Sequence, residues 1–256
     1  MKGQFKFEGK GGEFFSLAFV QILLTVITAG IYGAWAMAKI WKYLAGKVTL
    51  DGKPFRFDGE GGEMFSLFLV QGLLTMVTAG IYGPWAMVKI CKYMTEKIVY
   101  EDKTFSFTGE GGKLFSMILI GGLLTMITAG IYGAWLYVKV FRYLLENLSY
   151  DGKTFGFTAE GGQLFSIMFV QVLLTMITIG IYAAWAEVKI DTYVIGCITY
   201  GDNTAFSFKG EGGKLFSILI KGVLLTIITA GIYIYWFLME FYGYMLGVTS
   251  IEEKSA

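Results

Sequence analysis

The stretch Leu23-Leu24-Thr25-Val26-Ile27-Thr28-Ala29-Gly30-Ile31-Tyr32-Gly33-Ala34-Trp35 occurs five times in closely similar form, and it decides the fold. The related segments are Leu73 to Trp85, Leu123 to Trp135, Leu173 to Trp185 and Leu224 to Trp236. The first four copies begin 50 residues apart, and the fifth begins 51 residues after the fourth. A fixed period of this size predicts a repeat protein whose units pack against their neighbours. We therefore divide the chain into repeats at about 4–50, 51–100, 101–150, 151–200 and 201–251, with a tail at 252–256.

Each copy lies in a long run without charged residues, which covers the 25 residues from Phe14 to Ala38 in the first repeat. About 20 apolar residues span a bilayer core as a helix, so these runs predict membrane helices. The composition agrees, because the chain is 55% hydrophobic and only 16% charged, whereas an ordinary soluble domain is about 25% charged. We therefore predict one membrane domain over residues 1–256, and the lipid bilayer as its first partner.

Several classes of function are disfavoured by the composition. The net charge of +1 gives no reason to expect a nucleic-acid partner. The chain has no histidine, which removes the usual general base and the commonest metal ligand. Cys91 and Cys197 occupy different places in their repeats, so their spacing predicts neither a disulfide nor a metal site. We predict no catalytic residues, no cofactor and no metal, and hence no enzyme.

Each repeat has the pattern of a β-hairpin followed by a glycine-rich turn. In residues 48–57 two β-prone runs flank Asp51-Gly52, a dipeptide that suits a type I′ turn. The segment Gly59-Glu60-Gly61-Gly62 follows, and it lacks the Gly-Lys-Ser/Thr ending of a phosphate-binding loop. We interpret it as a turn from strand to helix, with acidic residues near the helix N-terminus.

A glycine interrupts the apolar run of every repeat and indicates two helices rather than one. In the second copy Gly80 is followed by Pro84, and this order is typical of one helix ending and another starting. A hairpin folded at Gly30 places Gln21, nine residues before it, level with Lys39, nine residues after it. One long kinked helix is the alternative, since membrane helices tolerate Gly and Pro. The predicted turn glycines are Gly30, Gly80, Gly130, Gly180 and Gly231.

Polar and charged side chains within these runs are the candidate functional residues, because such groups are costly in hydrocarbon. They are Gln21, Lys39, Gln71, Lys89, Lys139, Gln171, Glu187, Lys189, Lys221 and Glu240. In the fifth repeat Glu240 replaces the lysine, and Lys221 appears on the opposite helix, which predicts an ion pair. That pair either has a functional role or fixes the register between units. For the other lysines the simpler interpretation is that they reach lipid headgroups.

The two ends of the sequence fit a closed arrangement. Gln4 to Phe7 matches the second strand of a hairpin and Val248 to Ile251 matches a first strand, so their pairing would complete a fifth hairpin. Basic residues such as Lys47 and Lys53 recur in similar form in several linkers, and the positive-inside rule then places the linkers and both termini in the cytoplasm. The predicted fold is an α-helical integral membrane protein in a pseudo-fivefold closed ring. Each repeat would comprise a β-hairpin and a helix-turn-helix membrane hairpin, which either crosses the bilayer or is re-entrant.

A combined motif runs through the repeats and carries a family resemblance. In the second copy it reads Phe57-Asp58-Gly59-Glu60-Gly61-Gly62, then Leu74-Thr75, Thr78, Gly80-Ile81-Tyr82, Trp85, Lys89 and Tyr93. This spacing resembles the YjgN-like family of bacterial inner-membrane proteins, and the resemblance covers essentially the whole chain in five copies. It implies a location in the bacterial inner (cytoplasmic) membrane, and it implies no active-site residues.

Two functions are compatible with these features. The first is a structural or interaction protein, either a scaffold or an accessory subunit of a membrane assembly, with other membrane-protein subunits or further copies of itself as partners. The second is a pseudo-fivefold pore or transporter for small ions, anions in particular, because rings of lysines can select anions. We favour the structural role, because uniform repeats, an aromatic content of 17% and 35 glycines fit close packing and interfacial anchoring.

Overall fold

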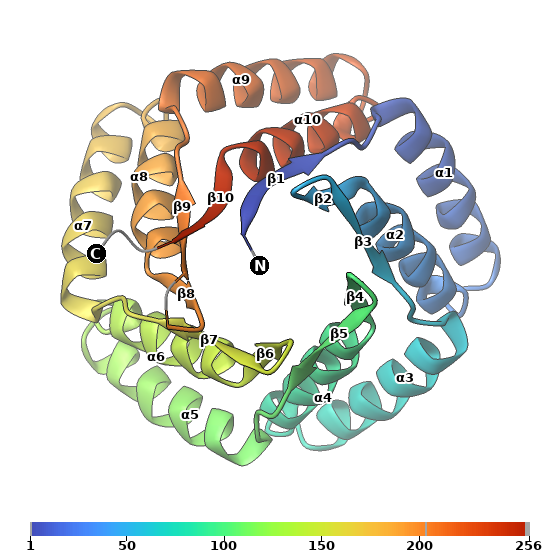
Figure 1. Cartoon of the computed structure of the whole chain (residues 1–256), viewed down its shortest axis with the longest axis horizontal. Helices are drawn as coiled ribbons and strands as arrows, with labels where there is room; N and C mark the ends of the chain where they lie inside the picture. The colour runs from blue at the N-terminus through green and yellow to red at the C-terminus, as the bar shows by residue number, and fades with distance from the viewer. Residues whose placement is uncertain (1, 203, 254–256) are drawn as a thin grey trace. The chain divides into compact units, whose positions relative to one another are not determined.

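A computed structural model describes residues 2–202 and 204–253 of the chain. Its described part contains five similar repeats, each with the order strand, helix, helix, strand (Figure 1). The first helices are α1 (Gly11–Ile27), α3 (Gly61–Val77), α5 (Gly111–Ile127), α7 (Gly161–Ile177) and α9 (Gly212–Ile228). The second helices are α2 (Gly33–Lys47), α4 (Gly83–Glu96), α6 (Gly133–Glu146), α8 (Ala183–Gly196) and α10 (Ile234–Gly247).

The strands are short, and they pair antiparallel with the strands next to them in sequence, while β1 also pairs with β10. They are β1 (Gly3–Phe7), β2 (Val48–Leu50), β3 (Lys53–Phe57), β4 (Ile98–Tyr100), β5 (Lys103–Phe107), β6 (Leu148–Tyr150), β7 (Lys153–Phe157), β8 (Ile198–Tyr200), β9 (Thr204–Phe208) and β10 (Thr249–Glu253). Asp51 and Gly52 both have positive φ, 50° and 76°, as the predicted type I′ turn between β2 and β3 requires. Strand β4 pairs with β3 on one side and with β5 on the other.

The predicted break in each apolar run is present, so the alternative of one long helix is wrong. Helix α1 ends at Ile27 and α2 begins at Gly33. Gly30 has φ of +92°, which glycine adopts without a steric penalty, and its N–H donates to the Thr25 carbonyl at 2.8 Å. The Thr28 hydroxyl donates to the Leu24 carbonyl at 2.8 Å and accepts the Tyr32 N–H at 3.0 Å. The equivalent threonines of the other repeats, Thr78, Thr128, Thr178 and Thr229, make the same two bonds.

The predicted fold class is wrong in two respects, although the five repeats are present. The strands do not form separate hairpins, because their order β1-β10-β9-β8-β7-β6-β5-β4-β3-β2 is that of one closed antiparallel barrel. The expected pairing of the terminal strands is part of this sheet, with Gly3 opposite Ile251. In addition, the part of the chain that the structure describes has no helix that is both long enough and apolar enough to cross a membrane.

Both errors have a physical origin in the sequence pattern. The 25-residue uncharged run is divided by the turn into two helices, and the 17 residues of α1 are about 26 Å long, less than the roughly 30 Å of a bilayer core. The three-residue strands, such as β2 and β4, are too short to show an alternating pattern. Nothing in such a short run indicates that both of its edges are paired.

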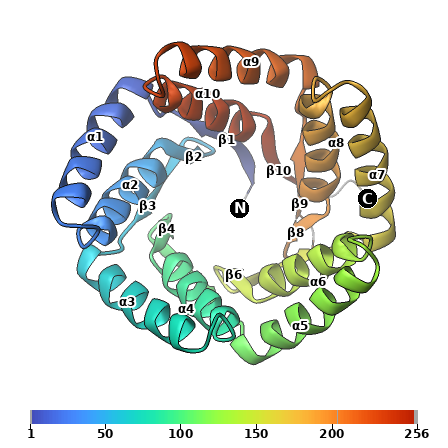
Figure 2. The ribbon, with the colours of Figure 1, turned by 180° about the vertical axis from the view of Figure 1, so that it is seen from behind.

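The chain divides into two compact units, which are residues 1–15, 49–52 and 156–256 in the first and residues 16–48 and 53–155 in the second. Each unit has its own core. In the second unit Phe57 of β3 and Met64 of α3 are fully buried and pack against Ala34 and Ala38 of α2. Phe208 and Leu215 pack in the same way against Ala184 in the first unit. The core therefore lies where the second helix of one repeat meets the strand and first helix of the next, as the positions of α2 and α3 show (Figure 2).

Candidate functional site

A tryptophan from one repeat rests on a glycine of the next and fixes where the hairpins lie. A Cβ atom on Gly61, the first residue of α3, would lie 2.3 Å from Cδ1 of Trp35 and 2.7 Å from its Cα. The same contact joins Gly11 to Trp236, Gly111 to Trp85 and Gly212 to Trp185. The glycine-rich segment thus provides a packing surface for an indole ring, in addition to forming the turn into a helix. Sequence reasoning missed this role, although Trp and Gly recur together in every repeat.

In the first repeat two of the predicted candidates, Gln21 and Lys39, meet a tyrosine inside the hairpin. The side chain of Gln21 on α1 is buried, and its Oε1 accepts the Tyr32 hydroxyl hydrogen at 3.3 Å. Lys39 on α2 donates from Nζ to the Tyr32 oxygen at 2.9 Å and lies over the same ring. Tyr32, which we had not singled out as a site residue, therefore links Gln21 to Lys39. In the second repeat Tyr82 bonds Gln71 at 3.2 Å, and Lys89 lies over its ring.

The third repeat has a different hairpin interior, because Gly121 occupies the position equivalent to Gln21, and Leu136 occupies the position equivalent to Ala36. A Cβ on Gly121 would lie 2.3 Å from Cδ1 of Leu136, so the leucine fills the space that the glutamine stem would need. Lys139 still donates to the Tyr132 oxygen, at 2.7 Å. The fifth repeat follows the same rule, since a Cβ on Gly222 would lie 2.0 Å from the ring of Phe237.

At these two equivalent positions, every hairpin therefore has a large residue on one helix and a small one on the other. The pairs are Gln21 with Ala36, Gln71 with Ala86, Gly121 with Leu136, Gln171 with Ala186 and Gly222 with Phe237. Sequence reasoning missed this complementarity. The signal was available, because the two positions change together whenever the repeats are compared.

In the fourth repeat the candidate residues do not form a cluster. Gln171 is buried, and its Oε1 has no hydrogen-bond partner among the described residues. Glu187 and Lys189 on α8 are exposed. Burial and, to a smaller extent, the charge of Glu187 together raise the pKa of Asp191, one turn further along α8, to about 6. This repeat therefore differs from the first in both its buried amide and its acidic residues.

The ion pair expected in the fifth repeat is present. Lys221 Nζ on α9 lies 2.5 Å from Glu240 Oε1 on α10, and this bond raises the pKa of Lys221. The pair is not buried by protein, because the two side chains are 45% and 37% exposed. It replaces the Lys-Tyr contact of the first three repeats with a contact between opposite charges.

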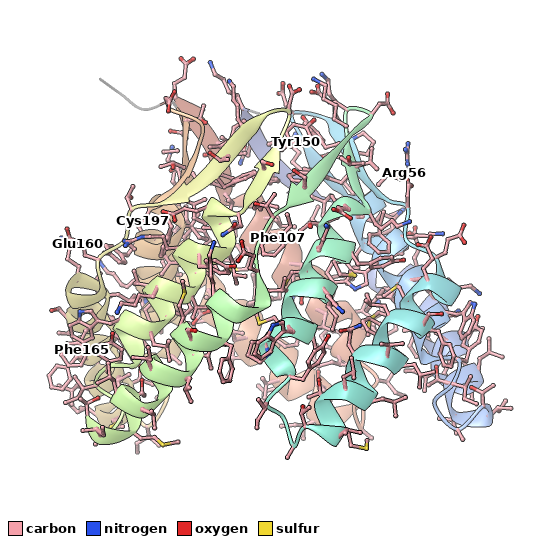
Figure 3. All side chains as sticks on the ribbon, turned by 90° about the horizontal axis from the view of Figure 1, so that it is seen from below. Arg56, Phe107, Tyr150, Glu160, Phe165 and Cys197 are labelled. Carbon is pink, nitrogen blue, oxygen red and sulfur yellow. The ribbon has the colours of Figure 1, made fainter. Side chains whose placement is uncertain are left out.

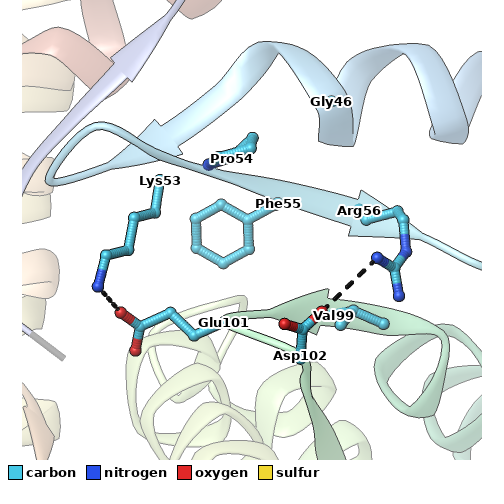
Figure 4. Close-up of a pocket in the computed structure, with 8 residues that line it drawn as sticks. All are labelled: Gly46, Lys53, Pro54, Phe55, Arg56, Val99, Glu101 and Asp102. Atoms are coloured by element: carbon cyan, nitrogen blue, oxygen red, sulfur yellow. Dashed lines mark hydrogen bonds and ion pairs between the residues drawn. The ribbon is translucent and has the colours of Figure 1, made fainter.

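Charged pairs lie at the strand end of the repeats, away from the hairpin turns. In the second unit Lys53 on β3 pairs with Glu101 of the next turn, and Arg56 Nη1 lies 3.9 Å from Asp102 Oδ1 (Figure 4). These residues line a pocket of about 470 Å³ at the edge of the sheet. Because its charges are already paired, this pocket is better described as part of a polar surface than as a binding site. No cluster of His, Cys, Asp and Glu within the described ranges could hold a metal ion.

The opposite end of each hairpin exposes large apolar side chains. Ile27 is 78% exposed and Ile127 is 79% exposed, and all five turns have equivalents. We call these residues the turn patches. They are Val26, Ile27 and Ile31; Met76, Val77 and Ile81; Met126, Ile127 and Ile131; Met176, Ile177 and Ile181; and Ile227, Ile228 and Ile232. In the second unit the turns lie at one end of the helices and the strands at the other (Figure 3).

The fold and these surfaces define a class of protein: tandem helix hairpins joined through a shared antiparallel sheet, polar at the strand end and apolar at the turns. The sequence profile described as "Bacterial protein of unknown function (DUF898)" matches residues 2–65, 53–106, 102–166, 154–202 and 203–256. The chain belongs to this family.

Curated relatives confirm the resemblance to YjgN-like proteins. Inner membrane protein YjgN of Salmonella typhimurium is 49% identical over 49 residues, which are 19% of this chain and 12% of the relative. Inner membrane protein YjgN of Escherichia coli K12 is 41% identical over 51 residues, which are 20% of this chain and 13% of the relative. The alignments thus span about one eighth of the length of these relatives. No solved structure matches the chain.

Proposed function

We propose that this protein is a structural or interaction protein of the bacterial inner membrane, and that it binds the membrane through its turn patches. The exposed apolar residues at every turn are the observation that carries the proposal. Contiguous exposed apolar surface on a folded protein marks a protein or membrane interface. Transfer of one such side chain out of water is worth about 1.5–3 kcal/mol. The relatives' name, inner membrane protein, supports the membrane as the partner.

The position of the lysines supports shallow insertion from one side. Lys39 follows the first residue of α2, Gly33, by six residues, or about 9 Å along the helix. Interfacial helices bury their apolar part about 5–10 Å into the boundary of headgroups and acyl chains. A turn at that depth places Lys39 and its equivalents Lys89, Lys139 and Lys189 among the phosphates. Long lysine stems can lie along apolar surface while the ammonium group stays in the polar layer.

The paired charges at the strand end, such as Lys53 with Glu101 and Lys103 with Asp151, then lie in the aqueous phase. We assign that phase to the cytoplasm, because basic residues recur in the linkers. The proposed role involves no catalytic step and no ion pore. The polar strand end is the surface that we assign to further subunits of a membrane assembly.

Flotation with phosphatidylcholine vesicles tests the proposal. Aspartate is introduced at one exposed position in successive turns, in the order Ile127, Ile27, Val77, Ile177 and Ile228. We expect each charged turn to lower the fraction of protein that floats, and the complete set to abolish flotation. The matched control is Thr154→Asp, which adds the same charge at an exposed position on β7. Undiminished flotation of the complete variant, with wild-type circular dichroism, would overturn the proposal.

A further inference from the structure

The third repeat contains a pocket of about 190 Å³ between the two helices of its hairpin. Ser116, Met117, Ile120 and Gly121 line it from α5, and Tyr132 and Lys139 line it from the turn and α6. The lining thus combines one ammonium group and two hydroxyl groups with an apolar wall, and it includes no carboxylate. A cavity of this composition is suited to a small anion.

The replacement of glutamine by glycine explains why this pocket has an unused hydrogen-bond donor. In the first repeat the Tyr32 hydroxyl accepts from Lys39 and donates to Gln21, so both of its functions are used. In the third repeat the Tyr132 oxygen accepts from Lys139 in the same way, but Gly121 offers no side-chain acceptor. Leu136 fills the volume of the missing stem and cannot accept a hydrogen bond. The Tyr132 hydroxyl hydrogen and the remaining Lys139 hydrogens are therefore available to a ligand.

We propose that this pocket binds a phosphate group, either as free phosphate or as the phosphate of a lipid headgroup. Lys139 supplies the positive charge and Tyr132 supplies a directed donor, and hydrogen bonds of a charged group are about twice as strong as those between neutral groups. The volume is below the roughly 300–1,000 Å³ of pockets for drug-sized ligands, which limits the ligand to a phosphate and a small substituent. Ile120, which is 60% exposed, continues the wall onto the apolar outer face of α5.

The fifth repeat has the same glycine but lacks the other features of the proposed phosphate site. Gly222 replaces the glutamine there as well, but Glu240 occupies the lysine position and pairs with Lys221. That hairpin offers an anion no unpaired positive charge. The third repeat combines the glycine with the lysine, and the first and second repeats fill the same position with Gln21 and Gln71.

The test exchanges the interiors of two hairpins in the full chain. Gly121→Gln with Leu136→Ala gives the third repeat the residues of the first, and Gln21→Gly with Ala36→Leu does the reverse. Inorganic phosphate is titrated into the detergent-solubilised protein by calorimetry. We expect one site in the wild type, none after the first exchange and two after the second. Tyr132→Phe and Lys139→Met should each raise Kd about tenfold or more, whereas Lys89→Met, the control for general charge, should not.

Vesicles distinguish the two sources of phosphate. If the ligand is a lipid headgroup, adding phosphatidylglycerol to phosphatidylcholine vesicles raises the affinity of the wild type more than that of the Gly121→Gln, Leu136→Ala variant. If it is free phosphate, the two proteins respond equally to the lipid and differ only in the calorimetric titration. Equal behaviour in both measurements, or an equal loss of phosphate binding in Lys89→Met, would overturn the proposal.

The lipid form of this inference rests on the proposed function, and the two can fail separately. If the wild type failed to float with vesicles of phosphatidylcholine alone, the proposed membrane role would be wrong. The titration with inorganic phosphate in detergent would still decide whether the pocket binds an anion.

Discussion

Contacts between consecutive repeats and contacts within each helix hairpin follow different rules. Between repeats the same pair recurs, a tryptophan packed on a glycine. A Cβ atom on Gly11, Gly61, Gly111 or Gly212 would lie 2.3–2.4 Å from the indole ring. Within the hairpins the equivalent positions hold a glutamine and an alanine in three repeats, and a glycine faces Leu136 or Phe237 in the other two. The junction between repeats accepts one geometry, because backbone approaches an aromatic ring there. The hairpin interior accepts several, provided that the combined volume is kept.

Breaking the contact between repeats should have the largest effect. Gly111→Ala places a methyl group 2.4 Å from Cδ1 of Trp85 and 2.7 Å from its Cα, and the backbone cannot yield as a flexible side chain could. We expect a loss of about 3 kcal/mol in the free energy of unfolding. The adjacent Gly112→Ala is the matched control, because nothing lies within 4 Å of its Cβ position, and it should be neutral or stabilising by about 0.5–1 kcal/mol. Denaturant titration of the two variants measures the difference, and equal stabilities would contradict it.

The interior of the fifth hairpin should tolerate an exchange but not a single change. Gly222→Gln collides with Phe237 and should cost about 2–3 kcal/mol of unfolding free energy. Adding Phe237→Ala recreates the pair found in the first repeat and should recover most of that loss. Phe237→Ala alone leaves a void and should itself be destabilising. A double-mutant cycle measures the coupling, and strictly additive effects would show that the two positions do not share volume.

The turns provide a smaller test, because the fourth differs from the others at one position. Ile179 has φ of +49° where the other repeats have alanine, and a β-branched residue is strained in this region. Its side chain is 94% exposed, so truncation removes no packing. Ile179→Ala should therefore raise the unfolding free energy by about 0.5–1 kcal/mol, measured as a higher melting temperature. A lower melting temperature would indicate that Ile179 makes contacts that stabilise the fold.

The ion pair of the fifth repeat should have the smallest effect on stability in water. Lys221 and Glu240 are both more than one third exposed, and exposed pairs contribute about 0.2–1 kcal/mol. We expect Lys221→Met and Glu240→Gln each to cost less than 1 kcal/mol, with a coupling of similar size in the double variant. Thermal unfolding at low and high salt measures it. A coupling of several kcal/mol, insensitive to salt, would mean that the pair is shielded from water.

Periodicity predicted the parts of this molecule that repeat along the chain, and it failed where a contact depends on distance in space. The 50-residue period, the turn at Gly30 and the Asp51-Gly52 turn follow from local spacing. The Lys221–Glu240 contact followed from a change at two positions that the predicted hairpin places level with each other. The expectation of membrane-crossing helices was wrong, because the predicted turn leaves first helices of only 17 residues, such as α1.

The missed contacts had weaker signals for a physical reason. Trp35 and Gly61 lie in different repeats and share no periodic face, so only steric reasoning on a structure relates them. Tyr32 lies in the turn between α1 and α2, and only the folded hairpin shows that its hydroxyl joins Gln21 to Lys39. The exchange of Gln21 and Ala36 for Gly121 and Leu136 was visible in the sequence. It would have emerged from comparing side-chain volumes between repeats instead of charges alone.

The hydroxyl of Thr28 has a thermodynamic consequence for the turn that it closes. A backbone amide or carbonyl without a partner costs several kcal/mol in hydrocarbon, which normally keeps tight turns in water. Here the amides of Gly30 and Tyr32 are already satisfied within the turn, and four further threonines repeat the arrangement. In the membrane association that we propose, the partition of each turn between water and lipid is then governed by its side chains, with no rearrangement of the backbone. Entry and exit should accordingly be fast and reversible, and their balance should follow the number and size of the apolar residues at the tip.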